Sequence, residues 1–213
     1  MSPSNPEFPH GAIHDLKFKL QSNRDVAVTS ELYPYGRVTV EEAKAQNRVR
    51  HEAAVTLVIA PINGRLNVLF IKRNNVGIHG GQIALPGGRK ENGESFENTA
   101  IRELQEETGV IVATENMVCE LQQVFIVPSQ FVVQPFAAML HYPPEITPNL
   151  QEIESAFWVD LDDIINATSY PCRVTPFGST NEMEVKAFVL NNQIIWGATA
   201  IILEDFRNRI RTK

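Results

Sequence analysis

Cysteine is scarce in this sequence, and an excess of basic residues is absent. The 213 residues include only two cysteines, Cys119 and Cys172, which form no CxxC pair. This pattern argues against a disulfide framework and predicts a reducing, cytoplasmic location. The formal net charge is −6, whereas a broad nucleic-acid surface normally carries a basic excess. Neither DNA nor RNA is therefore expected as a partner.

Long hydrophobic runs are also missing. No apolar stretch approaches the roughly 20 residues that a membrane-spanning helix needs, and residues 1–10 lack the basic and apolar regions of a signal peptide. No membrane partner is therefore expected. Apolar residues make up 43% of the chain and charged residues 21%, which is typical of a globular protein.

The order of apolar and turn-forming segments predicts a layered α/β fold. Residues 1–50 are expected to form an N-terminal extension with short helices, and residues 51–213 the main domain. The residues from 74 to 95 are rich in glycine and asparagine and predict a long, functional loop. The pattern predicts helices at 13–20, 39–47, 96–108, 161–166 and 198–209, and strands at 53–60, 66–71, 110–112, 121–127, 132–141 and 185–190.

Three glutamates in the expected helix 96–108 carry the strongest chemical signal. Residues three and four positions apart are neighbours on a helix, so Glu103 lies beside Glu106 and Glu107. Carboxylates at this spacing repel one another, and a divalent cation that prefers oxygen ligands would compensate them. Arg102 adds a positive charge that can hold a carboxylate through two hydrogen bonds. The alternative is an ordinary solvated helix face.

The wider spacing favours the metal site. Gly88 is followed after five residues by Glu94, and after seven more by Arg102-Glu103-Leu104-Gln105-Glu106-Glu107-Thr108-Gly109-Val110. This segment resembles the Nudix box and fills all of its fixed positions. The resemblance implies an α/β/α sandwich around a mixed sheet. It also implies Mg²⁺ or Mn²⁺ as cofactor, and attack by water on a phosphorus of a nucleoside diphosphate derivative.

The resemblance also implies roles for individual residues. Arg102 would orient the glutamates, and Glu103 and Glu106 would be catalytic, with Glu103 a candidate for the base that activates water. Glu152 matches a downstream acidic position that serves the metals in many Nudix enzymes, and a surface residue is the alternative. The implied metal ligands are the backbone carbonyl of Gly87 and the side chains of Glu103, Glu106, Glu107 and Glu152.

A second resemblance narrows the substrate. Residues 69–73 (LFIKR), 79–88 (HGGQIALPGG), 127–136 and 195–200 are similar to motifs of the coenzyme A pyrophosphatase subgroup of Nudix hydrolases. This likeness implies that the nucleotide substrate contacts Lys72, Arg73, His79 and Gln82. The chain departs from the subgroup at three positions. Lys72 and Gly77 stand where the subgroup usually has arginines, and Leu85 stands where it usually has phenylalanine.

The favoured reaction is the hydrolysis of coenzyme A to adenosine 3′,5′-bisphosphate and 4′-phosphopantetheine. One alternative is a Nudix pyrophosphatase for ADP-ribose or another nucleoside diphosphate derivative. Another is a Nudix protein that binds a nucleotide without cutting it, although a pure sensor has no need for all of the glutamates. A homodimer is a possible assembly.

Overall fold

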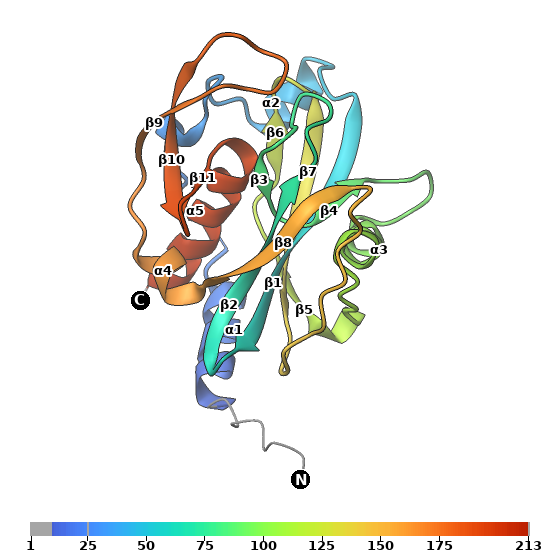
Figure 1. The fold of residues 1–213 in the computed structure, drawn as a ribbon, viewed down its shortest axis with the longest axis vertical. Helices are drawn as coiled ribbons and strands as arrows, with labels where there is room; N and C mark the ends of the chain where they lie inside the picture. The colour runs from blue at the N-terminus through green and yellow to red at the C-terminus, as the bar shows by residue number, and fades with distance from the viewer. Residues whose placement is uncertain (1–9, 25, 213) are drawn as a thin grey trace.

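The computed structural model describes residues 10–24 and 26–212, around a mixed sheet of eight strands (Figure 1). Strands β1 (His51–Ile62) and β7 (Phe131–Met139) are parallel, and their other neighbours are antiparallel. Residues 1–9, on which the signal-peptide prediction largely depends, lie outside the described part. Within that part, no helix has the length and hydropathy needed to cross a bilayer.

The expected strands 53–60 and 66–71 are present as β1 and β2 (Arg65–Arg73), which form a hairpin with Ile62 opposite Arg65. Asn63 and Gly64 between them have φ angles of 50° and 77°, which suit a two-residue turn of this kind. The sheet follows the order β3 (Ile83–Ala84), β2, β1, β7, β5 (Met117–Glu120), while β4 (Gly87–Arg89), β6 (Val124–Ile126) and β8 (Ile153–Asp160) pair with β1, β7 and β2 respectively.

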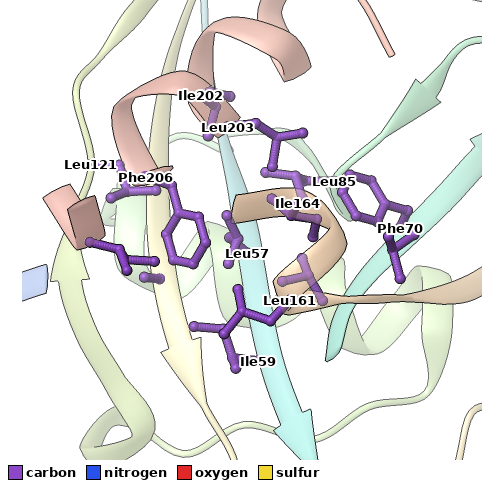
Figure 2. Close-up of a cluster of buried hydrophobic side chains, with 14 of the residues drawn as sticks. Leu57, Ile59, Phe70, Leu85, Leu121, Leu161, Ile164, Ile202, Leu203 and Phe206 are labelled. Carbon is purple, nitrogen blue, oxygen red and sulfur yellow. The ribbon is translucent and has the colours of Figure 1, made fainter. Parts of the chain in front are cut away.

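Helices cover both faces of this sheet, which confirms the predicted α/β/α sandwich. Successive residues of a strand point to opposite faces, so Leu57 and Ile59 pack on one side of β1 while Val58 and Ala60 pack on the other. The first face is covered by α1 (His10–Ser22), α4 (Leu161–Asn166) and α5 (Gly197–Arg211), and the second by α3 (Phe96–Thr108). Figure 2 shows the packing of α4 and α5 against β1 and β2.

The N-terminal extension is part of the main core. Leu16 and Leu20 of α1 and Leu32 of the short 3-10 helix η1 (Ser30–Leu32) are buried in the same hydrophobic cluster as Leu57. The expected second helix is α2 (Val40–Ala45), and Thr39 begins it with the predicted capping box. The segment before β1 therefore packs on the domain through the buried side chains of α1, η1 and α2.

Some strands differ from the sequence-based expectation. Residues 110–112 form no strand, because Val110 and Val112 pack beneath α3 without a partner strand. The expected strand 121–127 is shorter, since the backbone N–H of Gln122 bonds to the carboxylate of Asp205 instead of to a neighbouring strand. The sequence analysis missed six strands, of which β3 and β4 lie in the expected loop 74–95; the others are β5, β8, β9 (Tyr170–Val174) and β11 (Gln193–Ile195). The expected strand 185–190 is β10 (Met183–Leu190).

Candidate active site

Two glycines bring the loop ahead of α3 against the sheet. A Cβ on Gly87, whose φ is +151°, would lie 2.3 Å from the carbonyl oxygen of Ala54 in β1. A Cβ on Gly88 would lie 2.3 Å from Oε2 of Glu103. Side chains at these positions would collide with the strand or displace the carboxylate, so glycine is needed for the close approach.

Helix α3 presents its glutamates to this loop. Ser95 begins the helix by accepting a hydrogen bond from the Asn98 N–H at 3.1 Å, and Gly109 ends it in the left-handed conformation. The helix is fixed to the sheet because the hydroxyl of Thr56 in β1 donates to the carbonyl of Ala100 at 3.0 Å. The limits of this helix match the sequence prediction.

Arg102 is the centre of an ionic network. Its Nε and Nη2 donate to the two oxygens of Glu94 at 2.9 and 3.0 Å, which is a two-bond clamp. Its Nη1 donates at 2.8 Å both to Glu103 and to Glu106. Arg102 therefore clamps Glu94 and holds the other two glutamates through one nitrogen.

Burial changes the acidity of two of the glutamates. Burial raises the pKa of Glu107 to about 7, and repulsion from Glu103 and Glu152 adds to this, although the N–H of Gly87 donates to its Oε2 at 2.8 Å. The pKa of Glu103 is also raised, first by burial, against the opposing effect of Arg102. Glu106 is different, since 49% of its side chain is exposed. Two partly desolvated carboxylates thus face the glycine loop.

Glu152 reaches this region from the turn before β8. Its negative charge raises the pKa of both Glu103 and Glu107, and its Oε1 accepts a hydrogen bond from Asn149 at 3.0 Å. In residues 10–24 and 26–212, no three acidic, histidine or cysteine side chains stand close enough together to hold a metal ion by themselves. The predicted ligands therefore lie in one neighbourhood without forming a finished cage.

A cavity of about 490 Å³ adjoins the box. Gly87, Gly88 and Arg89 form part of its lining, and so do the predicted substrate contacts Arg73, His79 and Gln82. The Nε2 of His79 lies 3.1 Å from the hydroxyl of Ser129 in the turn between β6 and β7, and burial, followed by the nearby Arg73, lowers the pKa of His79. The imidazole is therefore favoured in its neutral form.

Lys72 is separated from this group. Its Nζ forms an ion pair with Glu154 of β8 at 2.7 Å, and Lys72 is not among the described residues that line the cavity. Lys72 and Arg73 are consecutive in β2, and the register with β8 shifts between them. The two cations that the sequence analysis grouped are thus divided between two environments.

The NUDIX domain model of known families matches residues 50–174. The chain belongs to the Nudix family. It is 28% identical over 174 residues to the mouse mitochondrial coenzyme A diphosphatase NUDT8, which covers 76% of this chain and 80% of the relative. It is 30% identical over 105 residues to the peroxisomal coenzyme A diphosphatase ndx-8 of Caenorhabditis elegans, which covers 48% of this chain and 45% of that relative.

A solved structure gives the same fold. The MutT/nudix family protein from Enterococcus faecalis aligns with a TM-score of 0.54 and 18% identity, over 79% of this chain and 68% of that protein. The family match and the relatives confirm the resemblance to Nudix hydrolases and to their coenzyme A pyrophosphatase subgroup. The protein is a Nudix pyrophosphohydrolase.

The residues of this Nudix site fit a divalent cation. Glu103 and Glu107 carry hard oxygen atoms of the kind that such a cation prefers, and a nearby positive charge would offset the burial and the repulsion that raise their pKa values. Mg²⁺ is commonly held by one or two carboxylates together with water and substrate phosphates. A site without a complete protein cage is consistent with that kind of binding.

Several lining residues of the Nudix cavity were missed by sequence reasoning. They come from distant parts of the chain, namely Tyr33 and Tyr35 of the extension, Ser129, Phe177 and Trp196. Residues 127–136 and 195–200 were noted for their likeness to the subgroup, which was the available signal for Ser129 and Trp196. Tyr33, Tyr35 and Phe177 carried no comparable signal, because they belong to no motif.

Proposed function

We propose that this protein hydrolyses the diphosphate linkage of coenzyme A to adenosine 3′,5′-bisphosphate and 4′-phosphopantetheine. The proposal rests on the observation that the segment resembling the Nudix box forms part of the cavity lining. The strand Gly87–Arg89, against which Glu103 and Glu107 lie, is also a wall of the cavity that Arg73 lines. A substrate in this cavity would have its diphosphate beside the carboxylates.

Glu103, Glu106 and Glu107 would hold the divalent cation, Mg²⁺ or Mn²⁺, with the carbonyl of Gly87 and the side chain of Glu152 as further ligands. When bound, such a cation neutralises phosphate charge and lowers the pKa of a coordinated water. The N–H of Gly87 donates to the carboxylate of Glu107 and would hold it in place as a metal ligand.

The remaining roles follow from the contacts of the side chains. Arg102 orients Glu103 and Glu106, because one of its nitrogens bonds to both. Glu103 is the candidate for the base that accepts a proton of the attacking water, since its carboxylate lies against Gly88 and is oriented by Arg102. Arg73 supplies a permanent positive charge to the substrate phosphates, and His79 and Gln82 supply neutral hydrogen-bonding groups.

Analysis of the reaction products by mass spectrometry tests this function. The purified protein is incubated with coenzyme A, ADP-ribose and a set of nucleoside diphosphate derivatives in the presence of Mg²⁺. We expect adenosine 3′,5′-bisphosphate and 4′-phosphopantetheine from coenzyme A. Hydrolysis of ADP-ribose alone would support the alternative substrate, and binding without any hydrolysis would support the sensor.

The Glu106→Gln and Glu107→Gln variants test the assigned roles. Glutamine preserves the size of the side chain and removes its charge, so we expect the fold to be retained and the turnover to be nearly abolished. Glu97→Gln, in the first turn of the same helix, is the matched control and should keep wild-type activity. A Glu107→Gln enzyme with wild-type turnover at saturating Mg²⁺ contradicts the assignment.

Cytoplasmic location and homodimerisation stay predictions. The two coenzyme A diphosphatases named above are a mitochondrial and a peroxisomal protein, so cell fractionation is the direct test of location. Light scattering on the purified protein tests the homodimer.

A further inference from the structure

The N-terminal extension supplies one wall of the cavity. Residues Tyr33, Pro34, Tyr35 and Gly36 line it together with the box strand Gly87–Arg89. These four residues precede the segment that matches the Nudix family. A ligand that fills the cavity therefore contacts both the catalytic box and a part of the chain outside the family match.

This wall is held in place by the rest of the fold. Leu32, directly before it, is 1% exposed and belongs to the main hydrophobic core. Glu31 forms an ion pair with Lys186 of β10, and the hydroxyl of Tyr35 donates to Sδ of Met183 at 3.7 Å. Contacts of the residues before Tyr33 and of Tyr35 after it thus fix the positions of the two tyrosines.

The loop between β9 and β10 adds another aromatic residue to this wall. Phe177 of that loop packs on Gly80, because a Cβ placed on Gly80 would lie 2.8 Å from its Cγ. Tyr35, Ile78 and Phe177 line the cavity and yet are 46%, 52% and 42% exposed. When a ligand covers large apolar groups that contact water at a cavity, the free energy of the complex is lowered, so such groups favour binding.

The lining is divided by its chemistry. Arg73, His79 and Gln82 supply charge and hydrogen bonds, whereas the extension and the β9–β10 loop supply aromatic rings. A ligand that fits both parts carries a charged phosphate group and a long uncharged arm. Both an adenine base and an uncharged arm can pack on aromatic rings. Pro34 and Pro176, which lie beside Tyr33, Tyr35 and Phe177 in the lining, have no side-chain hydrogen bond to offer a base, so the uncharged arm is the better match.

We propose that Tyr33, Tyr35 and Phe177 form a recognition wall for the uncharged, non-nucleotide arm of the substrate. This inference rests on the proposed function, and it makes the N-terminal extension a determinant of specificity. Tyr35 is the residue to change first, because its ring is nearly half exposed and its removal leaves the core intact.

Calorimetry with the two halves of coenzyme A separates the two parts of the cavity. We expect Tyr35→Ala to weaken the binding of 4′-phosphopantetheine about tenfold, the size of effect that a lost apolar contact in a pocket produces. The binding of adenosine 3′,5′-bisphosphate should stay unchanged. Tyr35→Phe keeps the ring and should have wild-type affinity. If the loss came instead from the missing bond between the hydroxyl and Met183, Tyr35→Phe would be as weak as Tyr35→Ala.

Tyr170→Ala is the matched control. Tyr170 is also 46% exposed, but it lies in β9 and is not one of the described residues that line the cavity. Its replacement should leave both affinities unchanged. Equal losses for the two halves in Tyr35→Ala would indicate a general structural effect and overturn the recognition wall.

The same measurements distinguish the wall from the proposed reaction. Wild-type protein that fails to cleave coenzyme A, but binds 4′-phosphopantetheine through Tyr35, would refute the reaction and support the wall. Wild-type protein that cleaves coenzyme A, but binds 4′-phosphopantetheine no more tightly than Tyr35→Ala does, would refute the wall and leave the reaction standing.

Discussion

Replacement of Glu94 by glutamine should remove a large part of the stability of the protein. The clamp from Arg102 lowers the pKa of Glu94 from 4.5 to about 2, and the hydroxyl of Thr99 supports the ionised form with a hydrogen bond of 2.7 Å. At 1.36 kcal/mol per pKa unit, this lowering corresponds to about 3 kcal/mol. The side chain is 15% exposed, so solvent screening reduces this value only modestly.

The sign of the effect determines its pH dependence. A carboxylate whose pKa is lowered by folding contributes its full stability above the unfolded-state value of about 4.5, and this contribution is lost as the pH falls through about 2. We therefore expect Glu94→Gln to lose about 2–3 kcal/mol of unfolding free energy at pH 7, and the difference from wild type to shrink to roughly 1–2 kcal/mol at pH 3.

Urea unfolding of both proteins between pH 7 and pH 3, followed by circular dichroism, measures this difference. Glu91→Gln is the control, because Glu91 is an exposed carboxylate in the same loop. Its unfolding free energy should follow wild type at every pH. Equal stability of Glu94→Gln and wild type at pH 7, or a difference that stays constant down to pH 3, would refute the reasoning.

Other predictions follow from the same contacts. Gly88→Ala should displace the carboxylate of Glu103 and lower kcat with little loss of stability, which steady-state kinetics and thermal unfolding together would show. Arg73→Ala should lower kcat/KM for coenzyme A by roughly 10–100-fold more than for 3′-dephospho-coenzyme A, whereas Lys72→Ala should affect both substrates equally. Complete chelation of divalent ions should abolish hydrolysis, and residual turnover in the chelated enzyme counts against the metal site. Asp205→Ala leaves Arg209 buried without its partner and should cost about 3–5 kcal/mol in urea unfolding.

The parts of the fold that depend on local signals were predictable from the sequence. Helix α3 has Ser95 at its start, Gly109 at its end and a regular apolar spacing between them, so its limits could be read directly. Strand β8 lacks such signals, because most of its residues are only half-buried and its pairing with β2 joins segments about 90 residues apart. Long-range pairing of this kind leaves little trace in a local pattern.

The functional site likewise has a part that could be predicted from local sequence and a part that could not. The box could be recognised because its glutamates and glycines occur at fixed distances along the chain. The walls of the cavity could not, because Tyr33, Ser129 and Trp196 meet only after the whole chain has packed. The separation of Lys72 from Arg73 could not be read from the sequence either, because it depends on the pairing of β2 with β8, whose register shifts between these two residues.

The contact between the N-terminal segment and α5 has a consequence for synthesis on the ribosome. The side-chain amide of Asn23 donates to the carbonyl of Arg209, and that of Asn208 donates to the carbonyl of Ala27, both at 2.7 Å. Proteins begin to fold while they are being made, starting from the N-terminus. Helix α1 packs on α5, which is made much later, as well as on β5, so its docking is complete only once α5 has emerged. The proposed recognition wall, which follows α1, therefore takes its place after the glutamates of α3 have been made, so a nascent chain carries these glutamates before the cavity is finished.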